Sequence, residues 1–359
     1  MHLPPALVLQ LLVWGTVVLG SLVTALILLG TAIQFRRDRL NRHRIARYQA
    51  WEDDLAVYLF SGDGVPRRFP TIAKEDRRLF QKFLTRYHAT LAGQEAEALR
   101  DLYLGLGVHP SLPRRLRHRL PSVRAQAAQE VGIFRLTEHL EAVVPLLDDP
   151  VPYVTHLAAQ ALTRSGDLRY AQAVVVWALR EERYQRERLL RVLEGFGPGL
   201  LPWLELNLDP PETAPEPWIL YALLAGSHRH RDSEPRLLEL IRTPQVDLQA
   251  SALKALAALG DPLTYPAVVP LAGHEAWQVR AQAAKALGLI GGPDAIPALI
   301  PLTSDPVYEV RRNAAQGMAD LGHAGTSALT WLAEDPTADR FARDIARERL
   351  EWADERGHQ

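Results

Sequence analysis

The sequence predicts an all-α protein in which a single N-terminal transmembrane helix is followed by an α-solenoid of short two-helix repeats. Three observations predict this fold. Residues 3–35 carry no charged side chain, an apolar pattern recurs every 31 residues beyond Pro121, and glycine recurs in one phase of that pattern. The chain then divides into an anchor (1–35), a juxtamembrane helix (36–60), a helical connector or N-terminal cap (61–120) and the repeat solenoid (121–359).

The anchor is predicted from its length and its flanks. About 20 apolar residues suffice to cross the hydrocarbon core of a bilayer. No Lys or Arg precedes the apolar stretch, whereas six arginines follow it and are expected at the membrane interface: Arg36, Arg37, Arg39, Arg42, Arg44 and Arg47. By the positive-inside rule, the N-terminus lies outside and the solenoid in the cytoplasm. We therefore expect a single-pass membrane protein that contacts the lipid bilayer through residues 3–35.

A stripe of small residues within the anchor suggests one further contact. Thr16, Gly20 and Thr24 are spaced four apart, which would let two anchor helices approach closely and form a homodimer. The alternative is that Gly and Thr are simply common in membrane helices.

The segment between anchor and repeats is expected to be helical. Apolar residues at helical spacing predict that the anchor helix continues to about residue 60, where Ser61 to Gly64 break it. Two further helices are expected at about 73–91 and 94–106, as a cap for the first repeat. A second basic run, which includes Arg115, is either a solvated connector or another headgroup contact.

The repeat is defined by Val-Arg-x-x-Ala-Ala, which begins at Val123, Val279 and Val310. Weaker copies begin at Val154, Leu248 and Phe341, and most steps are 31 residues. One copy is a residue longer, and the polar loop Gly226–Glu234 is the expected place for the extra residue. Glycines mark one turn in nearly every copy: Gly166, Gly197, Gly260, Gly291 and Gly322.

Each unit is expected to form two helices. The first carries a single stripe of Val, Ala and Leu, with small alanines that allow close packing. The second contains Pro145, Pro270 or Pro301 in one phase. Because an interior proline removes a helical hydrogen bond, a kinked or shortened second helix is expected. Stacked copies would share one continuous core.

These residues resemble the short HEAT-like repeats of the phycobilisome-lyase type, so the resemblance implies a HEAT-like α-solenoid. The third and fourth copies, about 182–243, depart from the pattern, through decay or because a partner docks there. The arrangement of anchor, helical neck and repeat array is also similar to bacterial membrane HEAT-repeat proteins encoded beside envelope glycosyltransferases. That resemblance implies the bacterial inner membrane as the location and a membrane glycosyltransferase as partner.

Catalytic chemistry is not predicted. The charges nearly cancel, with 41 basic and 42 acidic residues, so no basic field indicates a nucleic-acid partner. The absence of cysteine excludes disulfides and thiol catalysis. His274-Glu275 occurs once, without a second pair to complete a di-metal site, and His228 and His230 have no third ligand. We expect no enzyme activity, no metal and no cofactor.

A binding surface is predicted instead. Tryptophans on second helices are candidate partner contacts, with three polar companions: Trp177, Trp203 and Trp331, then Arg180, Glu205 and His139. The alternative for each tryptophan is that it fills the core between repeats.

The sequence thus predicts a membrane-tethered, cytoplasm-facing scaffold for a protein partner, such as a membrane glycosyltransferase of envelope polysaccharide synthesis. One alternative is a membrane-localised signalling adaptor that binds a soluble regulator. Another is a bilin-lyase-like or metal-dependent HEAT-repeat enzyme, which would retain pigment or metal on purification.

Overall fold

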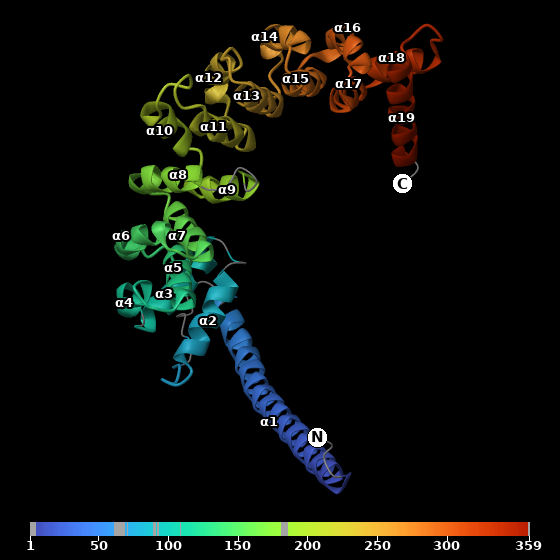
Figure 1. The fold of residues 1–359 in the computed structure, drawn as a ribbon. Coiled ribbons are helices and arrows are strands. Elements are labelled where there is room, and N and C mark those ends of the chain that lie inside the picture. The colour runs from blue at the N-terminus through green and yellow to red at the C-terminus, as the bar shows by residue number, and fades with distance from the viewer. Residues whose placement is uncertain are drawn as a thin grey trace. The chain divides into compact units, whose positions relative to one another are not determined.

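The computed structural model describes residues 5–60, 69, 71–88, 91, 93–107, 109–180 and 186–357, apart from some side chains within its helices. The described residues form helices and connecting turns and no strand (Figure 1), which confirms the all-α prediction. The chain separates into two compact units, Met1–Leu112 and Pro113–Gln359.

The first unit contains α1 (Pro5–Phe60), α2 (Arg77–His88) and α3 (Gly93–Gly105). Helix α1 continues without interruption up to Phe60. Its last turns pack through Trp51, whose ring centroid lies 5.0 Å from that of Phe80 and 5.6 Å from that of Phe83. This aromatic cluster forms the core of the unit.

No helix in the described part of the chain is long and apolar enough to cross a membrane. The side chains of several predicted anchor and interface residues lie outside the described residues: Thr16, Gly20, Arg36, Arg37, Arg39 and Arg42. Thr24 and Arg44 are exposed. Arg47 forms an ion pair with Asp76 at 3.0 Å and so contributes to the folding of its own unit.

The second unit is a succession of helix pairs (Figure 1). The first helices of the repeats are α5 (Pro121–Ile133), α7 (Pro152–Arg164), α9 (Arg186–Leu193), α11 (Pro215–Ser227), α13 (Val246–Leu259), α15 (Trp277–Ile290), α17 (Tyr308–Asp320) and α19 (Arg340–Gly357). Their apolar stripes, including Val131, Leu162 and Leu287, are fully buried between neighbouring repeats. The short α4 (Leu112–Leu116) precedes them.

The second helices are shortened where the sequence places proline. Helices α6 (Leu140–Val143), α14 (Tyr265–Val268) and α16 (Ile296–Leu299) span four residues each before the chain tightens into a 3₁₀ turn at Pro145, Pro270 or Pro301. Repeats without that proline keep longer second helices, as in α8 (Ala171–Arg180) and α18 (His323–Glu334). The predicted shortening is therefore confirmed. Its cause is that proline has no backbone N–H and cannot donate the next hydrogen bond of an α-helix.

An arginine clamp joins successive repeats. In α15, Nε and Nη2 of Arg280 donate to the two carboxylate oxygens of Asp305 at 2.7 and 3.1 Å. Nη1 of the same guanidinium donates to the carbonyls of His274 and Glu275. Asp305 also accepts a bond from the backbone N–H of Val307. One side chain thus holds its own helix, the preceding loop and the next loop together.

The clamp recurs in the first repeat, where Arg124 binds Asp149 at 2.6 Å and the carbonyls of His118 and Arg119. The hydrogen bond from Arg124 holds the pKa of Asp149 below its usual value. Burial raises the pKa of Asp305, but the bonds from Arg280 and the Val307 N–H outweigh it, and the net direction is downward. Both carboxylates therefore stay charged while they are nearly buried.

Arg115, from the second basic run, also serves the fold. Its Nη1 and Nη2 donate to both oxygens of the fully buried Glu130 at 2.6 and 2.8 Å. A buried carboxylate needs such a partner. This residue is therefore neither a solvated connector nor a headgroup contact.

The predicted turn glycines lie in left-handed backbone conformation at four of five positions: Gly166, Gly197, Gly260 and Gly322. Gly291 is the exception, with φ of −88°, and the following Gly292 takes the positive φ instead. In two other repeats the same turn is made by Arg135 and Arg229, with φ of 47° and 48°. The fold therefore requires this conformation even where the residue has a Cβ.

The extra residue of the longer copy does not lie in the loop Gly226–Glu234, so that prediction is wrong. Helices α5 and α11 both begin with proline and both span 13 residues. Arg229 of the fourth repeat takes the place of Arg135 of the first. The step from the turn at Gly197 to that at Arg229 is the long one, so the extra residue precedes α11.

Close helix contacts between repeats depend on glycine. A Cβ on Gly288 of α15 would lie 2.3 Å from the Cα of Gly317 in α17. A Cβ on Gly132 would likewise lie 2.6 Å from the Cα of Ala161. Only glycine allows backbones to approach this closely.

We predict that Arg280→Met lowers the free energy of unfolding by about 3 kcal/mol, because the nearly buried Asp305 loses its ionic partner. The control is Arg311→Met. Arg311 donates only to the backbone carbonyls of Asp305 and Pro306, so its loss should cost about 1 kcal/mol. Urea unfolding followed by circular dichroism measures both, and equal losses would contradict the clamp.

We also predict that Gly288→Ala costs about 2 kcal/mol, because the new Cβ forces α15 away from α17. Gly273→Ala is the matched control, since a Cβ there meets no atom within 4 Å, and it should change stability by less than about 0.5 kcal/mol. If thermal unfolding shows no difference between the two variants, the contact does not limit the packing of the repeats.

Candidate binding cleft

A cleft of about 380 Å³ lies between the third and fourth repeats. It is formed by the end of α10 (Leu200–Asn207), the loop that follows, α11 and α12 (Glu234–Leu240). Its lining residues are Glu205, Leu208, Pro210, Pro211, Glu212, Trp218, Arg236, Glu239, Leu240 and Thr243. The cleft therefore falls within the copies that depart from the repeat pattern.

Trp218 occupies the place of the clamp arginine. It is the fourth residue of α11, as Arg124 is of α5 and Arg280 of α15. The position of the matching aspartate holds Thr243, whose hydroxyl donates to the carbonyl of Leu240. Because neither residue can form the ion pair, the fourth and fifth repeats lack a charged clamp between them.

The indole takes over part of the clamp's role. Nε1 of Trp218 donates to the carbonyl of Asp209 at 2.7 Å, and the side chain is only 3% exposed. The clamp arginines bind carbonyls five and six residues before them, whereas Trp218 reaches back nine. The longer loop 208–214, which contains the extra residue, explains the difference and forms one wall of the cleft.

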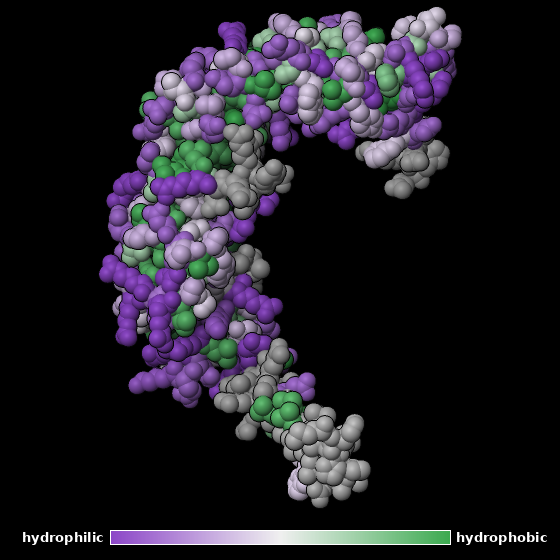
Figure 2. Space-filling model, viewed as in Figure 1, coloured by the Kyte–Doolittle hydropathy of each residue, from purple (hydrophilic) through white to green (hydrophobic). Residues whose placement is uncertain are grey.

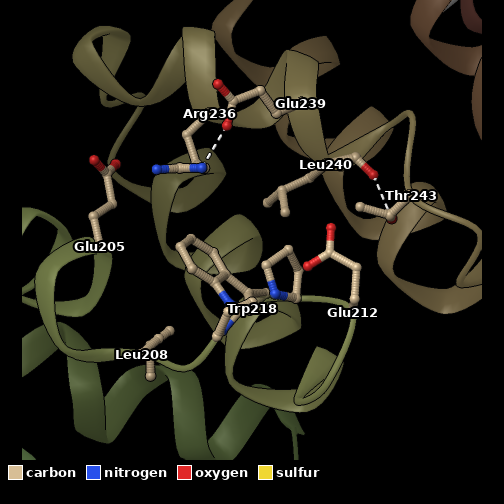
Figure 3. Close-up of a pocket in the computed structure, with 10 residues that line it drawn as sticks. Glu205, Leu208, Glu212, Trp218, Arg236, Glu239, Leu240 and Thr243 are labelled. Atoms are coloured by element: carbon tan, nitrogen blue, oxygen red, sulfur yellow. Dashed lines mark hydrogen bonds and ion pairs between the residues drawn. The ribbon is translucent and has the colours of Figure 1, made fainter.

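A guanidinium group from a different helix, that of Arg236, lies beside Trp218. Arg236 of α12 lies over the ring of Trp218, with its Cζ 5.2 Å from the ring centroid (Figure 3). It forms an ion pair with Glu239, which stands at the proline position of the other repeats. A cation over an indole ring is attracted by the ring's negative face, so Arg236 covers the apolar floor of the cleft.

Carboxylates surround that floor. Figure 3 shows Glu205 and Glu212 on opposite sides of Trp218, with Glu239 beside Arg236. The hydroxyl of Tyr221 donates to Glu205, and burial together with this bond raises the pKa of Tyr221. Glu212 is exposed and forms no ion pair with a described side chain. Three carboxylates against one paired guanidinium make the cleft acidic, and its floor is aromatic and aliphatic.

Hydrophobic side chains gather near this region. Figure 2 shows them on the visible face where α8, α10 and α11 lie, whereas hydrophilic side chains dominate the rest of that face. Leu206 of α10 is 85% exposed. Exposed apolar surface beside a cleft is typical of an interaction site.

The predicted tryptophans have different environments. Trp177 of α8 is 4% exposed and lies in the core, 6.3 Å from the His156 ring. Trp203 of α10 is partly buried. Trp331 of α18 is 57% exposed, so it is the one of the three that presents most of its surface.

Their polar companions are also separated. Glu205 lies in the cleft. Arg180 is exposed and pairs with Asp148 at 2.6 Å. His139 is half-buried, with its Nε2 3.8 Å from Glu138. The structure thus brings only Glu205 of the predicted set to the cleft.

The cleft residues Trp218 and Arg236 were not predicted. The signal that could have found Trp218 is the repeat register, since it stands where the Val-Arg-x-x-Ala-Ala copies have Arg124, Arg280 and Arg311. The equivalence holds only when the extra residue is placed before α11.

The histidines considered as metal ligands have other surroundings. His274 Nδ1 accepts a bond from the backbone N–H of Ala276, so it caps the loop before α15. His230 pairs with the hydroxyl of Ser233. Among the described residues, no group of three or more His, Asp or Glu side chains could hold a metal ion.

We predict that Trp218→Phe keeps the aromatic floor but loosens the loop, because the bond to the Asp209 carbonyl is lost. The cost should be about 1 kcal/mol. Hydrogen exchange should accelerate at Thr213 and Ala214, whose amides donate to the Pro210 carbonyl. Trp331→Phe is the control and should leave these amides unchanged. Unaltered exchange in Trp218→Phe would show that the indole does not hold the loop.

Comparison with known proteins gives a partial family match and a set of helical-repeat neighbours. Residues 265–351 match the HEAT repeats family, and no curated protein sequence matches significantly. Among solved structures, an engineered protein shares 16% identity, with 83% of this chain and 97% of that chain covered and a TM-score of 0.34.

Two natural proteins are similar at the same level. The complex of CpcE and CpcF of phycocyanin lyase from Nostoc shares 18% identity over 68% of this chain and 94% of that chain, with a TM-score of 0.32. Human deoxyhypusine hydroxylase in complex with glycerol shares 17% identity over 78% of this chain and 98% of that chain, with a TM-score of 0.30. At these identities and TM-scores the family match rests on residues 265–351 alone.

Proposed function

We propose that this chain is a membrane-tethered, cytoplasm-facing scaffold that binds a protein partner through the cleft between its third and fourth repeats. The observation that carries the proposal is the replacement of the Arg–Asp clamp by Trp218 and Thr243. Both residues line an acidic cleft, and the longer loop 208–214 forms one of its walls. HEAT-repeat solenoids serve as protein-interaction scaffolds, and the repeat family match supports this class of function.

The proposed tether is supported by the sequence of residues 3–35, which lacks charged side chains and is followed by a basic run. This pattern favours a span with the N-terminus outside and the solenoid in the cytoplasm of a bacterial cell. A tether would confine the repeats near the bilayer and raise their effective concentration for partners in the same membrane.

The charge of the cleft favours a partner that is itself a membrane protein. Cytoplasmic loops of membrane proteins carry an excess of Lys and Arg. A basic loop would match the three carboxylates around the cleft. We propose a membrane glycosyltransferase of envelope polysaccharide synthesis as this partner, because the arrangement of anchor, neck and repeats resembles proteins encoded beside such enzymes. The scaffold itself would carry no catalytic activity.

The test is an affinity purification of the full-length chain from native membranes in mild detergent, with quantification by mass spectrometry. Glu212→Lys reverses an exposed charge of the cleft and should lower recovery of the glycosyltransferase about tenfold, which corresponds to about 1.4 kcal/mol. Glu275→Lys is the matched control, because Glu275 is also an exposed acid in a loop before a first helix. It should leave recovery unchanged.

A third preparation, without residues 1–35, separates the roles of tether and cleft. Loss of the glycosyltransferase from this preparation would show that the anchor is needed for the complex. Recovery of a soluble regulator by every variant, without the glycosyltransferase, would contradict the proposal and favour the signalling adaptor. Equal recovery with Glu212→Lys and Glu275→Lys would show that the cleft is not the interface.

A further inference from the structure

A second recess, the terminal groove, lies between α17 and α19 at the end of the repeat array, with α15 at its edge. Its volume is about 380 Å³, and it is lined by Lys285, Tyr308, Arg312, Asn313, Ala315, Gln316, Ile345, Glu348, Arg349 and Trp352. The floor consists of the buried Ala315 and Ile345. Tyr308 and Trp352 form half-exposed aromatic walls.

The repeat register explains why a groove exists here. One repeat earlier, the positions of Glu348 and Arg349 are held by Gly317 and Met318. There the backbones of α15 and α17 nearly touch, as the contact between Gly288 and Gly317 shows. Large charged residues on α19 prevent the same approach to α17. The recess is therefore specific to the last pair of first helices.

The groove is basic. Lys285, Arg312 and Arg349 project from three successive first helices, and none forms an ion pair with a described carboxylate. Glu348, the one acid of the lining, accepts a hydrogen bond from the hydroxyl of Tyr308 at 2.8 Å. The three basic side chains therefore outnumber the single carboxylate, and the groove carries a net positive charge.

One guanidinium atom lacks an acceptor. Nε of Arg349 is buried and has no hydrogen-bond partner among the described residues. A buried N–H without an acceptor is costly, particularly on a charged group. Because that Nε is itself buried, a ligand in the groove would meet Arg349 through the charge of its guanidinium, which no described carboxylate pairs with.

We propose that the terminal groove binds an acidic peptide segment of a protein partner. Its carboxylates pair with Lys285, Arg312 and Arg349, and an apolar side chain lies between Tyr308 and Trp352. This site is separate from the acidic cleft and has the opposite charge, so it recognises a different segment.

Two other anionic ligands fit the groove less well. Nucleic acid is held by basic stripes that follow its phosphates, whereas the chain as a whole carries a net charge of −1 and this basic patch is confined to one recess. A bilayer surface is bound by an apolar face that inserts between lipids, whereas the apolar floor here is recessed. Phosphatidylserine vesicles and a single-stranded oligonucleotide are therefore used as competitors in the test.

The test uses the full-length chain in detergent micelles and a fluorescein-labelled peptide of alternating Glu and Leu, with binding followed by fluorescence anisotropy. Arg312→Gln and Lys285→Gln should each weaken binding about tenfold, the loss of one charge-assisted hydrogen bond. Lys254→Gln is the matched control, because Lys254 occupies the position of Lys285 one repeat earlier, and it should bind like the unmodified chain. A peptide of alternating Lys and Leu should not bind.

Arg349→Gln tests the orphaned guanidinium and should weaken binding at least as much as Arg312→Gln. If Arg349→Gln fails to fold, the exposed Arg312 and Lys285 still decide the question. Absence of binding, an equal loss in Lys254→Gln, or displacement of the peptide by the vesicles or the oligonucleotide at lower concentration would overturn the proposal.

Discussion

The arginine clamp is the interaction that fixes the connecting loops at the two junctions where it forms, through Arg124 with Asp149 and Arg280 with Asp305. Hydrophobic stripes bring successive first helices together, but they do not by themselves fix the path of the connecting loops. Arg280 does so with four donated bonds, two to Asp305 and two to backbone carbonyls of the preceding loop. Asp305 in turn caps the loop before the next helix. Each nearly buried charge is therefore satisfied, which makes an inward-facing ion pair tolerable.

The clamp has a different form in repeats that lack its aspartate or its arginine. The position that matches Asp305 one repeat later is Pro336, and Arg311 keeps its bonds to the backbone carbonyls but lies over the ring of Phe341, 4.5 Å from its centroid. In the second, fourth and fifth repeats the arginine itself is replaced, by Thr155, Trp218 and Gln249. Because the fold tolerates these exchanges at single junctions, a recess can arise at one junction without disturbing its neighbours.

Much of this fold could be predicted from local signals. Proline beyond the first turn stops a helix, so the shortened second helices follow from Pro145, Pro270 and Pro301 alone. The turn glycines were visible for the same reason, although the choice between Gly291 and Gly292 depends on how Ala295 and Tyr265 pack around the turn. The close approach of Gly288 to Gly317 could not be predicted, because it depends on the distance between two helices rather than on either sequence.

The cleft was harder to predict than the fold, because it lies where the repeat pattern fails. Leu224 continues the 31-residue step from Leu162 and Leu193, which made the copy look regular up to its end. The structure places the extra residue before α11, and only then does Trp218 coincide with Arg124. The predicted tryptophans were chosen by residue type on second helices, a criterion that cannot separate the buried Trp177 from the exposed Trp331.

The two recesses have a common physical origin. In a regular repeat, the charged residues form ion pairs with the next repeat and the small residues pack against it. Few of these side chains are then free to contact a ligand. At the fourth repeat the clamp is lost, and at the last repeat Gly317 and Met318 give way to Glu348 and Arg349. At both places some charged side chains lack an ion-pair partner among the described residues. They are carboxylates in the cleft and basic groups in the terminal groove. Specificity in such an array therefore comes from the copies that differ from the consensus, since the regular copies supply the rigid spacing between them.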